Sequence, residues 1–417
     1  MIHNLKILLF FSFTFLFSDA DNREYPDRFL VGYWHNFING AGPLLLSEIP
    51  DEFDVINISF AEPDSPFGSN ISFSPDLSIY PNPDDFQNDI ISLQNEGRKI
   101  LISIGGANGP IHLNNETDIQ QFVNSMMSLI SQYNFDGLDI DLEGQSLYLN
   151  PGDTDFRNPT SPTIVNFIEA IIPLTDQLPD DFILSAAPET AHVQGGASYY
   201  GTVWGVYLPV IHALRDRLSH LHVQHYNTGS MLAIDGNSYQ PATADFHVAM
   251  AEMLLTGFTV SGGLFFEALD ENQVMFGLPA GPSAAGSGYT NPETLLSALD
   301  YLIHGIPFGG SYNLNNQNGY PEFPGLMTWS INWDDYYGNE FSTIYGNYFD
   351  ELGELNCEAT GDVNDDGELN ILDIVNLVNF ILDNNIELEL EACADCNSDS
   401  EINILDVICM VNILISV

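Results

Sequence analysis

The sequence predicts a (β/α)8 barrel of the TIM type, followed by a small α-helical domain built on an internal repeat. Two observations predict the barrel: eight short apolar runs alternate with helical patterns between residues 29 and 349, and these runs are nearly continuous in apolar residues. Such runs are typical of parallel strands buried on both faces and covered by helices. A further observation concerns the C-terminal part: all four cysteines lie within residues 357–409, which marks a separate unit. The alternative is an open doubly wound sheet, which normally has fewer strands.

Each barrel strand is expected where apolar and β-branched residues are dense. The eight strands are expected at residues 29–34, 54–61, 99–106, 137–143, 182–188, 220–227, 273–279 and 325–331. Three intervening helices should begin with an N-cap residue followed by proline, at Asn82-Pro83, Ser161-Pro162 and Asn291-Pro292. After the third strand, Thr117 and Gln120 fit a capping box. These alternations account for residues 25–350 as one domain, and residues 357–417 form the second.

The N-terminus has the pattern of a secretory signal peptide. Lys6 precedes an apolar run, Ile7–Phe17, that is too short to span a bilayer. Small residues then predict cleavage after Ala20, so that residues 1–20 are removed and the protein is secreted or extracellular.

The net charge narrows the range of partners. Eight Lys and Arg stand against 58 Asp and Glu, a formal charge of −50. A surface this acidic repels nucleic acid and anionic membranes, so we expect neither as a partner. Cations and neutral ligands are compatible with it.

One strand carries an unusual number of acids. Residues 135–144 read FDGLDIDLEG, and their period-two alternation places Asp139, Asp141 and Glu143 on one face with leucine and isoleucine on the other. Burying three like charges costs several kcal/mol unless protons, hydrogen bonds or a ligand compensate. We therefore expect a functional site here.

Further polar and aromatic residues follow other strands of the expected barrel. They are Tyr33 at the end of the first strand, Glu189 after the fifth, Tyr226 and Asn227 at the end of the sixth, and Trp329 late in the eighth. Active sites of such barrels lie at the C-terminal ends of the strands, so these side chains should meet Glu143 at one mouth. Aromatic faces beside carboxylates suit a carbohydrate, whose sugar rings present apolar faces.

Several motifs resemble family 18 of the glycoside hydrolases, the chitinase family. They are DGLDIDLE (136–143), SIGG (103–106), AAPE (186–189), VQHYN (223–227) and MTWSINWD (327–334). The resemblance covers residues 28–350, and the motifs occur in the order expected of the family. The resemblance implies a secreted chitinase that hydrolyses β-1,4-linked N-acetylglucosamine polymers with retention of configuration. Catalysis would need no cofactor. It also implies cis peptide bonds at Ser59-Phe60 and Trp329-Ser330.

The resemblance assigns roles along the acidic strand. Glu143 would be the general acid, and the nucleophile would be the carbonyl oxygen of the substrate's own acetamido group. Asp141 would hold the acetamido N–H, Asp139 would share a proton with Asp141, and Asp136 would anchor the strand by bonding to Ser103.

The resemblance also implies contacts with the sugar. Tyr226 would hydrogen-bond the acetamido carbonyl, whereas His225 alternates away from the site and is interpreted as a satisfied core histidine. The other implied substrate-binding residues are Gln224 and Asn227 lining the site, Trp329 beneath the sugar, and Glu189 and Tyr33 on sugar hydroxyls.

The C-terminal domain contains an internal repeat, residues 361–382 and 394–415, with the second copy 33 residues after the first. Each copy places oxygen-bearing side chains at EF-hand-like positions before an apolar helix, with Asn370 and Asn403 as further donors acting directly or through water. The expected calcium ligands are Asp362, Asn364, Asp366, the Glu368 carbonyl and Asp373 in the first loop, and Asp395, Asn397, Asp399, the Glu401 carbonyl and Asp406 in the second. The pattern resembles a dockerin, which implies a cohesin-type protein as a partner, although Ser400 replaces the usual turn glycine.

The four cysteines allow three connectivities. We favour Cys357 with Cys393, because these two precede the calcium loops at similar offsets, which leaves Cys396 with Cys409.

Two other functions fit the same fold. One is an endo-β-N-acetylglucosaminidase acting on glycoprotein glycans, and the other is a chitin-binding lectin without activity. Lectins of this family usually lose the acid at the position of Glu143, which is present here. The lectin is therefore the least favoured.

Overall fold

A computed structural model describes residues 27–144 and 146–352 in the N-terminal part of the chain. In the C-terminal part it describes residues 361, 363–364, 369–382, 393–394, 396 and 402–416. The predicted signal peptide lies outside these residues. Within them, no helix has the length and apolar character needed to cross a membrane.

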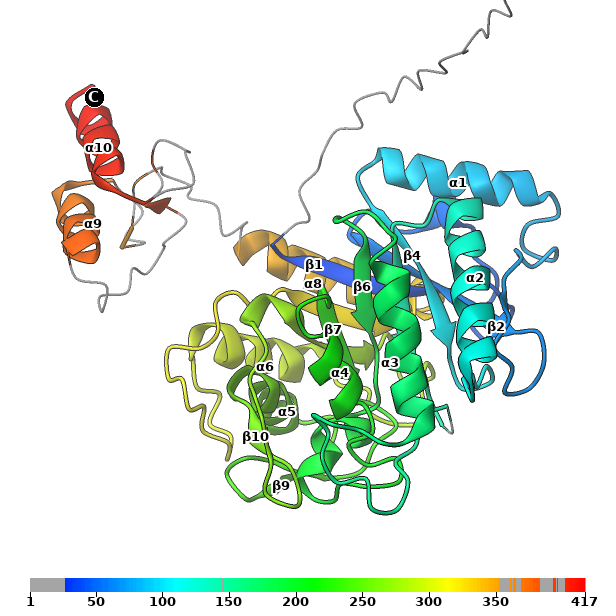
Figure 1. The fold of residues 1–417 in the computed structure, drawn as a ribbon. Coiled ribbons are helices and arrows are strands. Elements are labelled where there is room, and N and C mark those ends of the chain that lie inside the picture. The colour runs from blue at the N-terminus through cyan, green and yellow to red at the C-terminus, as the bar shows by residue number, and fades with distance from the viewer. Residues whose placement is uncertain are drawn as a thin grey trace, which may run out of the picture.

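The N-terminal part is the predicted (β/α)8 barrel (Figure 1). Its strands are β1 (Phe29–His35), β2 (Val55–Pro63), β4 (Lys99–Gly105), β5 (Gly137–Asp141), β6 (Ile183–Ala186), β7 (His220–Gln224), β12 (Val274–Pro279) and β13 (Gly325–Trp329). Each of these strands pairs in parallel with the next, and β1 pairs with both β2 and β13, so the sheet closes. The short strand β3 (Ile71–Ser72) adds an antiparallel hairpin to β2. All eight predicted strands are confirmed.

Helices surround the barrel. They are α1 (Pro83–Asn95), α2 (Glu116–Tyr133), α3 (Pro162–Thr175), α4 (Leu208–Leu214), α5 (Ala244–Thr256), α6 (Pro292–His304), α7 (Ile331–Tyr336) and α8 (Glu340–Leu352). The predicted starts at Asn82-Pro83, Ser161-Pro162 and Asn291-Pro292 are confirmed. The capping box at Thr117 is wrong, because Asn115 caps α2 by accepting hydrogen bonds from the backbone N–H groups of Thr117 and Asp118.

Small strands and turns lie in the loops between the barrel elements. They are β8 (Met231–Leu232) with β9 (Ser238–Tyr239), β10 (Phe258–Thr259) with β11 (Phe265–Phe266), and the single-turn helices η1 (Leu46–Glu48), η2 (Thr190–His192), η3 (Gln194–Ala197) and η4 (Glu271–Gln273). The C-terminal part contributes α9 (Ile371–Leu382) and α10 (Ile404–Ser416).

Two apolar layers explain the alternation along the strands. The large layer lies between the barrel and its helices and includes Leu138, Ile140 and Leu142 of the acidic segment. A smaller cluster fills the inside of the barrel and includes Val31, Leu101 and Met327. The acids that alternate with the leucines of β5 therefore point into the barrel, as the period-two pattern predicts.

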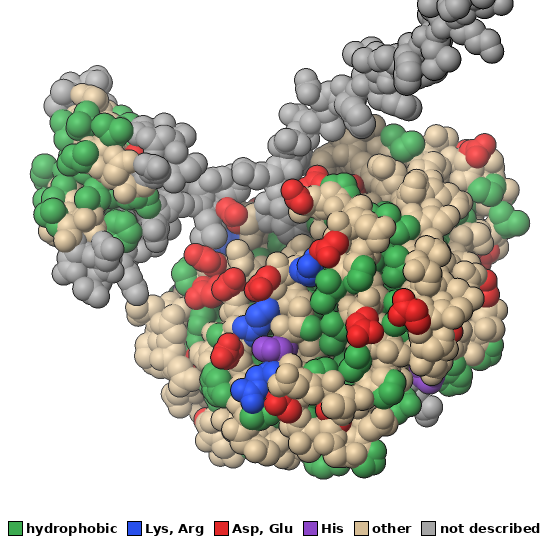
Figure 2. Space-filling view, viewed as in Figure 1, with side chains coloured by type: hydrophobic (Ala, Val, Ile, Leu, Met, Phe, Trp, Pro, Cys, Tyr) green, Lys and Arg blue, Asp and Glu red, His purple; other side chains and the backbone are tan. Residues whose placement is uncertain are grey.

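Within the described residues, four of the six Lys and Arg side chains contact an acid. On the face seen in Figure 2, Lys and Arg form a short band with Asp and Glu beside it. Arg217 contacts Asp176 at 2.6 Å, and Arg157 contacts Asp155 at 3.1 Å. The positive charge of these side chains is thus largely balanced locally.

Candidate active site

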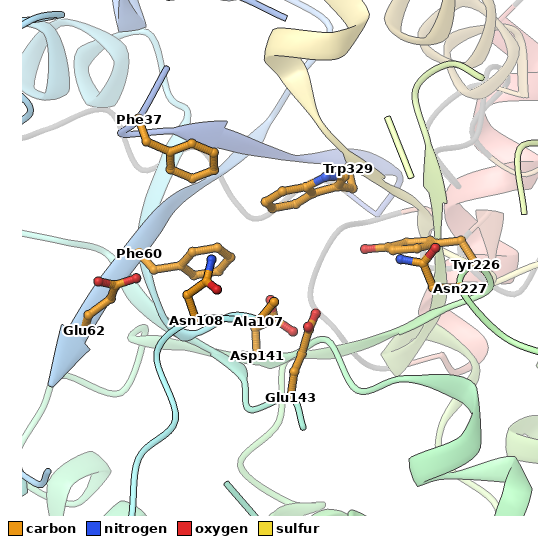
Figure 3. Close-up of a pocket in the computed structure, with 10 residues that line it drawn as sticks. All are labelled: Phe37, Phe60, Glu62, Ala107, Asn108, Asp141, Glu143, Tyr226, Asn227 and Trp329. Atoms are coloured by element: carbon orange, nitrogen blue, oxygen red, sulfur yellow. The ribbon is translucent and has the colours of Figure 1, made fainter. Parts of the chain in front are cut away.

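A pocket of about 560 Å³ opens at the C-terminal end of the barrel strands. Figure 3 shows its walls: Asp141 and Glu143 lie on one side, Trp329 faces them, and Tyr226 with Asn227 closes one end. The remaining lining residues are Phe37, Phe60, Glu62, Ala107 and Asn108. Aromatic faces and carboxylates thus meet in one cavity, as the sequence predicts.

The strand ends place the reactive groups. β5 ends at Asp141 and β7 at Gln224, earlier than predicted, so Glu143 and Tyr226 lie in the turns just beyond the strands. The SIGG motif allows close packing there. Gly105 has φ +103°, and a Cβ at this residue would lie 2.4 Å from the Asp141 carbonyl oxygen. Only glycine lets the end of β4 approach β5 this closely.

Asp139 lies fully buried below the pocket and is surrounded by donors. Its Oδ2 accepts hydrogen bonds from the hydroxyls of Tyr33 (2.5 Å) and Ser103 (2.7 Å), and its Oδ1 accepts one from Ser185 (2.7 Å). His222 Nε2 lies 3.2 Å from Oδ1. Burial alone would raise the pKa of Asp139, but the contacts with His222, Tyr33 and Ser103 outweigh it and hold this pKa below its usual range.

Two predictions about this strand are not supported by its hydrogen bonds. Asp139 was expected to share a proton with Asp141, yet both of its oxygens are taken by other donors and its ionised form is favoured. Asp136 was expected to bond to Ser103. Asp136 precedes β5 at the opposite end of the barrel and accepts from the Ile100 N–H, whereas strand register pairs Ser103 with Asp139.

Asp141 and Glu143 share a single side-chain donor. The Nε2 of Gln224 lies 3.0 Å from Asp141 Oδ1, 3.0 Å from Glu143 Oε1 and 3.0 Å from the carbonyl oxygen of Ala187. Burial, and then repulsion by Glu143, Asp139 and Glu189, raises the pKa of Asp141 well above its usual range. Burial also raises the pKa of Glu143, against the opposing hydrogen bond from Gln224. This pair therefore holds protons more readily than ordinary carboxyls do.

Three predicted sugar contacts are not supported by the pocket. Tyr33 is 1% exposed and its hydroxyl is used by Asp139, so it supports the strand from below. Gln224 is 2% exposed, and its amide donates to Asp141, Glu143 and the carbonyl oxygen of Ala187, so it positions carboxylates and does not line the cavity. Glu189 is not a lining side chain; burial and then repulsion by Glu143 raise its pKa.

The other predicted contacts do line the pocket. The Trp329 indole lies parallel to the Phe60 ring, with centroids 5.9 Å apart and planes at 14°. Tyr226 is 5% exposed; burial, and then the charge of Asp141, raises the pKa of its hydroxyl well above the usual range, so it remains a donor. Asn227 Oδ1 accepts from the Gly286 and Ser287 N–H groups, which fixes its side chain.

Sequence reasoning missed half of the pocket wall. Phe37 follows β1, Ala107 and Asn108 follow β4, and Phe60 and Glu62 lie in the C-terminal half of β2. This position at the C-terminal ends of strands is the signal that could have found them. The cis peptide bonds predicted at Ser59-Phe60 and Trp329-Ser330 are both confirmed.

His225 is a core residue, as predicted. Its ring stacks on Phe276 with centroids 4.6 Å apart, and its Nδ1 lies 3.2 Å from His247 Nδ1. Burial lowers its pKa well below the usual range, so the ring is neutral. Its Nε2 is buried and has no hydrogen-bond partner among the described residues, so the description "satisfied" is only partly right.

The C-terminal helices preserve the symmetry of the repeat. Asp373 and Asp406 are both fully buried, and each accepts a hydrogen bond from a backbone N–H just before its helix, that of Asn370 (2.7 Å) or Asn403 (2.8 Å). Asp373 also accepts from the Val363 N–H at 3.2 Å. These carboxylates are therefore aimed back into their loops, where a cation ligand at this position must point.

Other predictions for this domain fall partly outside the described residues. Asn364 is described, and its N–H lies 3.3 Å from Asp373. Cys396 and Cys409 form the predicted disulfide, and Cys393 is also disulfide-bonded. The residues outside the described part are Cys357, Asp362, Asp366, Glu368, Asp395, Asn397, Asp399 and Glu401.

Comparison with known sequences separates the same two parts. Residues 30–261 match the sequence model of glycosyl hydrolases family 18, and residues 360–415 match that of the dockerin type I domain. Chitinase Chi52 of Paenibacillus xylanexedens is 54% identical over 338 residues, which cover 81% of this chain and 64% of the relative. Chitinase D of Niallia circulans is 53% identical, with 79% and 63% covered. The chain thus spans slightly less than two thirds of these relatives.

Shorter relatives and solved structures agree with this division. A probable class II chitinase of Arthroderma benhamiae is 40% identical over 74% of this chain and 95% of its own length. The crystal structure of a family GH18 chitinase from Chromobacterium violaceum superposes with a TM-score of 0.71 at 37% identity, covering 79% of this chain and 85% of that one.

Proposed function

The chain belongs to glycosyl hydrolases family 18, and from that premise we propose that it is a chitinase that cleaves β-1,4-linked N-acetylglucosamine polymers. One observation carries the proposal: Asp141 and Glu143 share one amide donor at the wall of a pocket that Trp329 closes. Such a pair keeps a proton for transfer beside a surface on which a sugar ring can stack. The names of the similar chitinases support the same substrate class.

In the first step, Glu143 gives its proton to the glycosidic oxygen as the bond to C1 breaks. The carbonyl oxygen of the substrate's acetamido group forms the new bond to C1 from the opposite face, which yields an oxazolinium ion. Asp141 accepts the acetamido N–H and balances the positive charge. The Tyr226 hydroxyl, which remains protonated, donates to the acetamido oxygen and orients it for attack.

In the second step, water replaces the acetamido oxygen at C1. The Glu143 carboxylate takes a proton from that water and returns to its starting acid form. Two displacements at C1 give net retention of configuration. Asp139 takes no part in proton transfer; as an anion held by three hydroxyls it keeps the charge of β5 fixed beneath Asp141.

The test is hydrolysis by the full chain of N-acetylglucosamine oligomers, with cello-oligomers as the matched control. We expect cleavage of the first and none of the second, because cello-oligomers lack the acetamido nucleophile. Comparable hydrolysis of both would contradict the proposal. Release of glycans from a glycoprotein without cleavage of chitin oligomers would assign the endo-β-N-acetylglucosaminidase function in its place.

We further propose that the C-terminal domain binds two calcium ions and a cohesin-type protein. Asp373 and Asp406 would hold the ions together with the loop oxygens predicted from the sequence, and calcium would supply the positive charge that lets the acidic loops close. Apolar side chains gather over α9 and α10 (Figure 2), and Ile371, Leu372, Ile404 and Leu405 are all more than half exposed. These matched pairs recur at the 33-residue interval and suit a protein partner.

Calorimetry with the full chain tests the calcium proposal. We expect two calcium ions per chain in the wild type, one in Asp373→Ala and one in Asp406→Ala. A stoichiometry that is unchanged in both variants would contradict the assignment. For export, we propose cleavage after Ala20, which N-terminal sequencing of the mature protein checks.

A further inference from the structure

We propose that Phe67, His112 and Tyr148, called the aromatic row below, form a second sugar-binding platform that receives units of the glycan chain lying outside the main pocket. The proposal rests on the proposed function, because the ligand is the same N-acetylglucosamine polymer. It deepens that function by assigning residues that favour long chains over short ones.

The three residues come from adjacent loops on the active face of the barrel. Phe67 lies between β2 and β3, His112 between β4 and α2, and Tyr148 between β5 and α3. Each loop follows the C-terminal end of its strand. The same three strand ends deliver Glu62, Asn108 and Glu143 to the pocket.

The rings form a row in contact. The centroids of Phe67 and His112 are 4.6 Å apart, with ring planes at 41°, and those of His112 and Tyr148 are 6.4 Å apart, with planes at 62°. The outer members are well exposed, Phe67 by 43% and Tyr148 by 40%. Three touching aromatic rings from separate loops make a surface wider than one side chain.

Packing joins the row to the pocket wall. A Cβ at Gly109 would lie 3.2 Å from Cγ of Glu62, so the loop that carries His112 passes directly against a pocket residue. The Ile111 N–H donates to Ser146 Oγ at 3.3 Å, which ties this loop to the one that carries Tyr148. The loop that carries His112 therefore connects the pocket wall at Glu62 with the loop that carries Tyr148.

Folding alone does not account for Phe67. Its φ is +58°, a left-handed conformation that is unusual for a bulky residue, and the residue is 43% exposed. The aromatic group Trp333, Tyr336 and Tyr337 is different, since a Cβ at Gly40 would lie 3.1 Å from Trp333 and Tyr337 accepts a hydrogen bond from the Ser283 N–H. That group holds loops together, whereas Phe67 gains little from packing.

The chemistry of the polymer fits this surface. In a β-1,4-linked N-acetylglucosamine chain the ring substituents are equatorial, so both faces of each sugar present C–H groups that stack on aromatic rings. The ligand is uncharged, so the net charge of −50 does not oppose its binding. The exposed Tyr148 can also offer its hydroxyl to a sugar hydroxyl.

The experiment compares short and long oligomers in full-length variants. The test variants are Phe67→Ala, Tyr148→Ala and the double substitution, and the matched control is Ile91→Ala, an exposed apolar residue (46%) on α1. Each ring is expected to contribute about three- to tenfold. We expect kcat/KM for the hexamer to fall by about tenfold or more in the double variant, while kcat/KM for the shortest cleaved oligomer stays within about twofold.

A second arm separates this proposal from the proposed function. Binding of the same oligomers is measured in the Glu143→Gln background, where hydrolysis is not required. Weaker hexamer binding in the double variant, with trimer binding unchanged, supports the row even if the wild type hydrolyses nothing. If the double variant binds the hexamer as tightly as the parent protein does, the aromatic row has no role and the proposal is overturned. An equal loss of affinity for trimer and hexamer would overturn it as well. Absence of binding by any oligomer would overturn the row and the proposed function together.

Discussion

Two regions of the acidic segment 136–143, the barrel interior at Asp139 and the barrel mouth at Asp141 and Glu143, affect buried carboxylates in opposite ways. In the interior, Asp139 receives hydrogen bonds from three hydroxyls and lies 3.2 Å from His222 Nε2. At the mouth, Asp141 and Glu143 divide one amide of Gln224 between them. The contacts in the interior lower the pKa of Asp139, whereas burial at the mouth raises the pKa values of Asp141 and Glu143.

The difference shows how one period-two pattern supplies both a fixed anion and a proton carrier. All three side chains point into the barrel, so sequence alternation alone does not separate them. The number of hydrogen-bond donors around each carboxylate distinguishes them, because each hydrogen bond to a carboxylate stabilises its ionised form. The interior has donors on both neighbouring strands, and the mouth has few.

The largest expected effect is at the mouth. Glu143→Gln should reduce kcat on N-acetylglucosamine oligomers by about a thousandfold or more, because the amide keeps the shape and lacks a transferable proton. Initial rates measure the loss, and calorimetry should show that oligomer binding persists. A variant retaining a tenth of the wild-type rate would refute the role of Glu143.

Neighbouring acids of β5 should respond in opposite directions to neutral substitution. Asp139→Asn should lower the free energy of unfolding at pH 7 by about 2–4 kcal/mol, because it removes a buried anion and leaves hydroxyl donors facing an amide. Asp141→Asn should leave it unchanged or raise it by up to about 1 kcal/mol, because a desolvated, repelled carboxyl is removed.

The effects of Asp139→Asn and Asp141→Asn on the free energy of unfolding should depend on pH in different ways. The pKa of Asp139 is lowered on folding, so its contribution is present above the usual value of 3.8 and is lost as the pH falls through the folded pKa. The pKa of Asp141 is raised, so any gain in Asp141→Asn should appear as the pH rises above 3.8. Urea unfolding at several pH values measures both; equal shifts for the two variants would remove the distinction.

A smaller effect should follow from removing the shared donor. Gln224→Met takes away the hydrogen bond that favours the ionised form of Glu143, so the pKa of this acid should rise further. Because Glu143 acts in its protonated form, the alkaline limb of the kcat/KM profile should move to higher pH. Movement to lower pH would contradict this reading of the pair.

The smallest expected effect concerns Tyr33. Tyr33→Phe removes one of three hydroxyl donors to Asp139, so it should cost about 1 kcal/mol of stability and reduce kcat by less than about tenfold. KM should not change, because the hydroxyl contacts Asp139 and the ring is buried. A raised KM with normal kcat would restore the sugar contact predicted from the sequence.

The sequence predicted the fold and the reactive acids well for a physical reason. Continuous apolar runs and the alternation around Asp141 depend on local order along the chain, and both persist in the folded barrel. The close approach that SIGG permits, and the placement of Trp329 in the pocket, likewise follow from motifs within single strands.

Partners between strands were not predictable in the same way. The row Ser103, Asp139 and Ser185 depends on the register of three strands, which no single segment encodes. The pocket residues Ala107 and Asn108 lie in a loop without periodicity. These features follow from tertiary geometry.

The most direct test of the central claim, a single acid acting with the substrate's own nucleophile, is the anomeric form of the first product. Proton NMR of oligomer hydrolysis, recorded before mutarotation, reports whether the newly formed reducing end is β or α. We expect β-product, because attack by the acetamido oxygen and then by water inverts C1 twice. Early α-product would mean that water attacks directly with a second carboxylate as base, and it would contradict the roles assigned to Glu143 and Asp141.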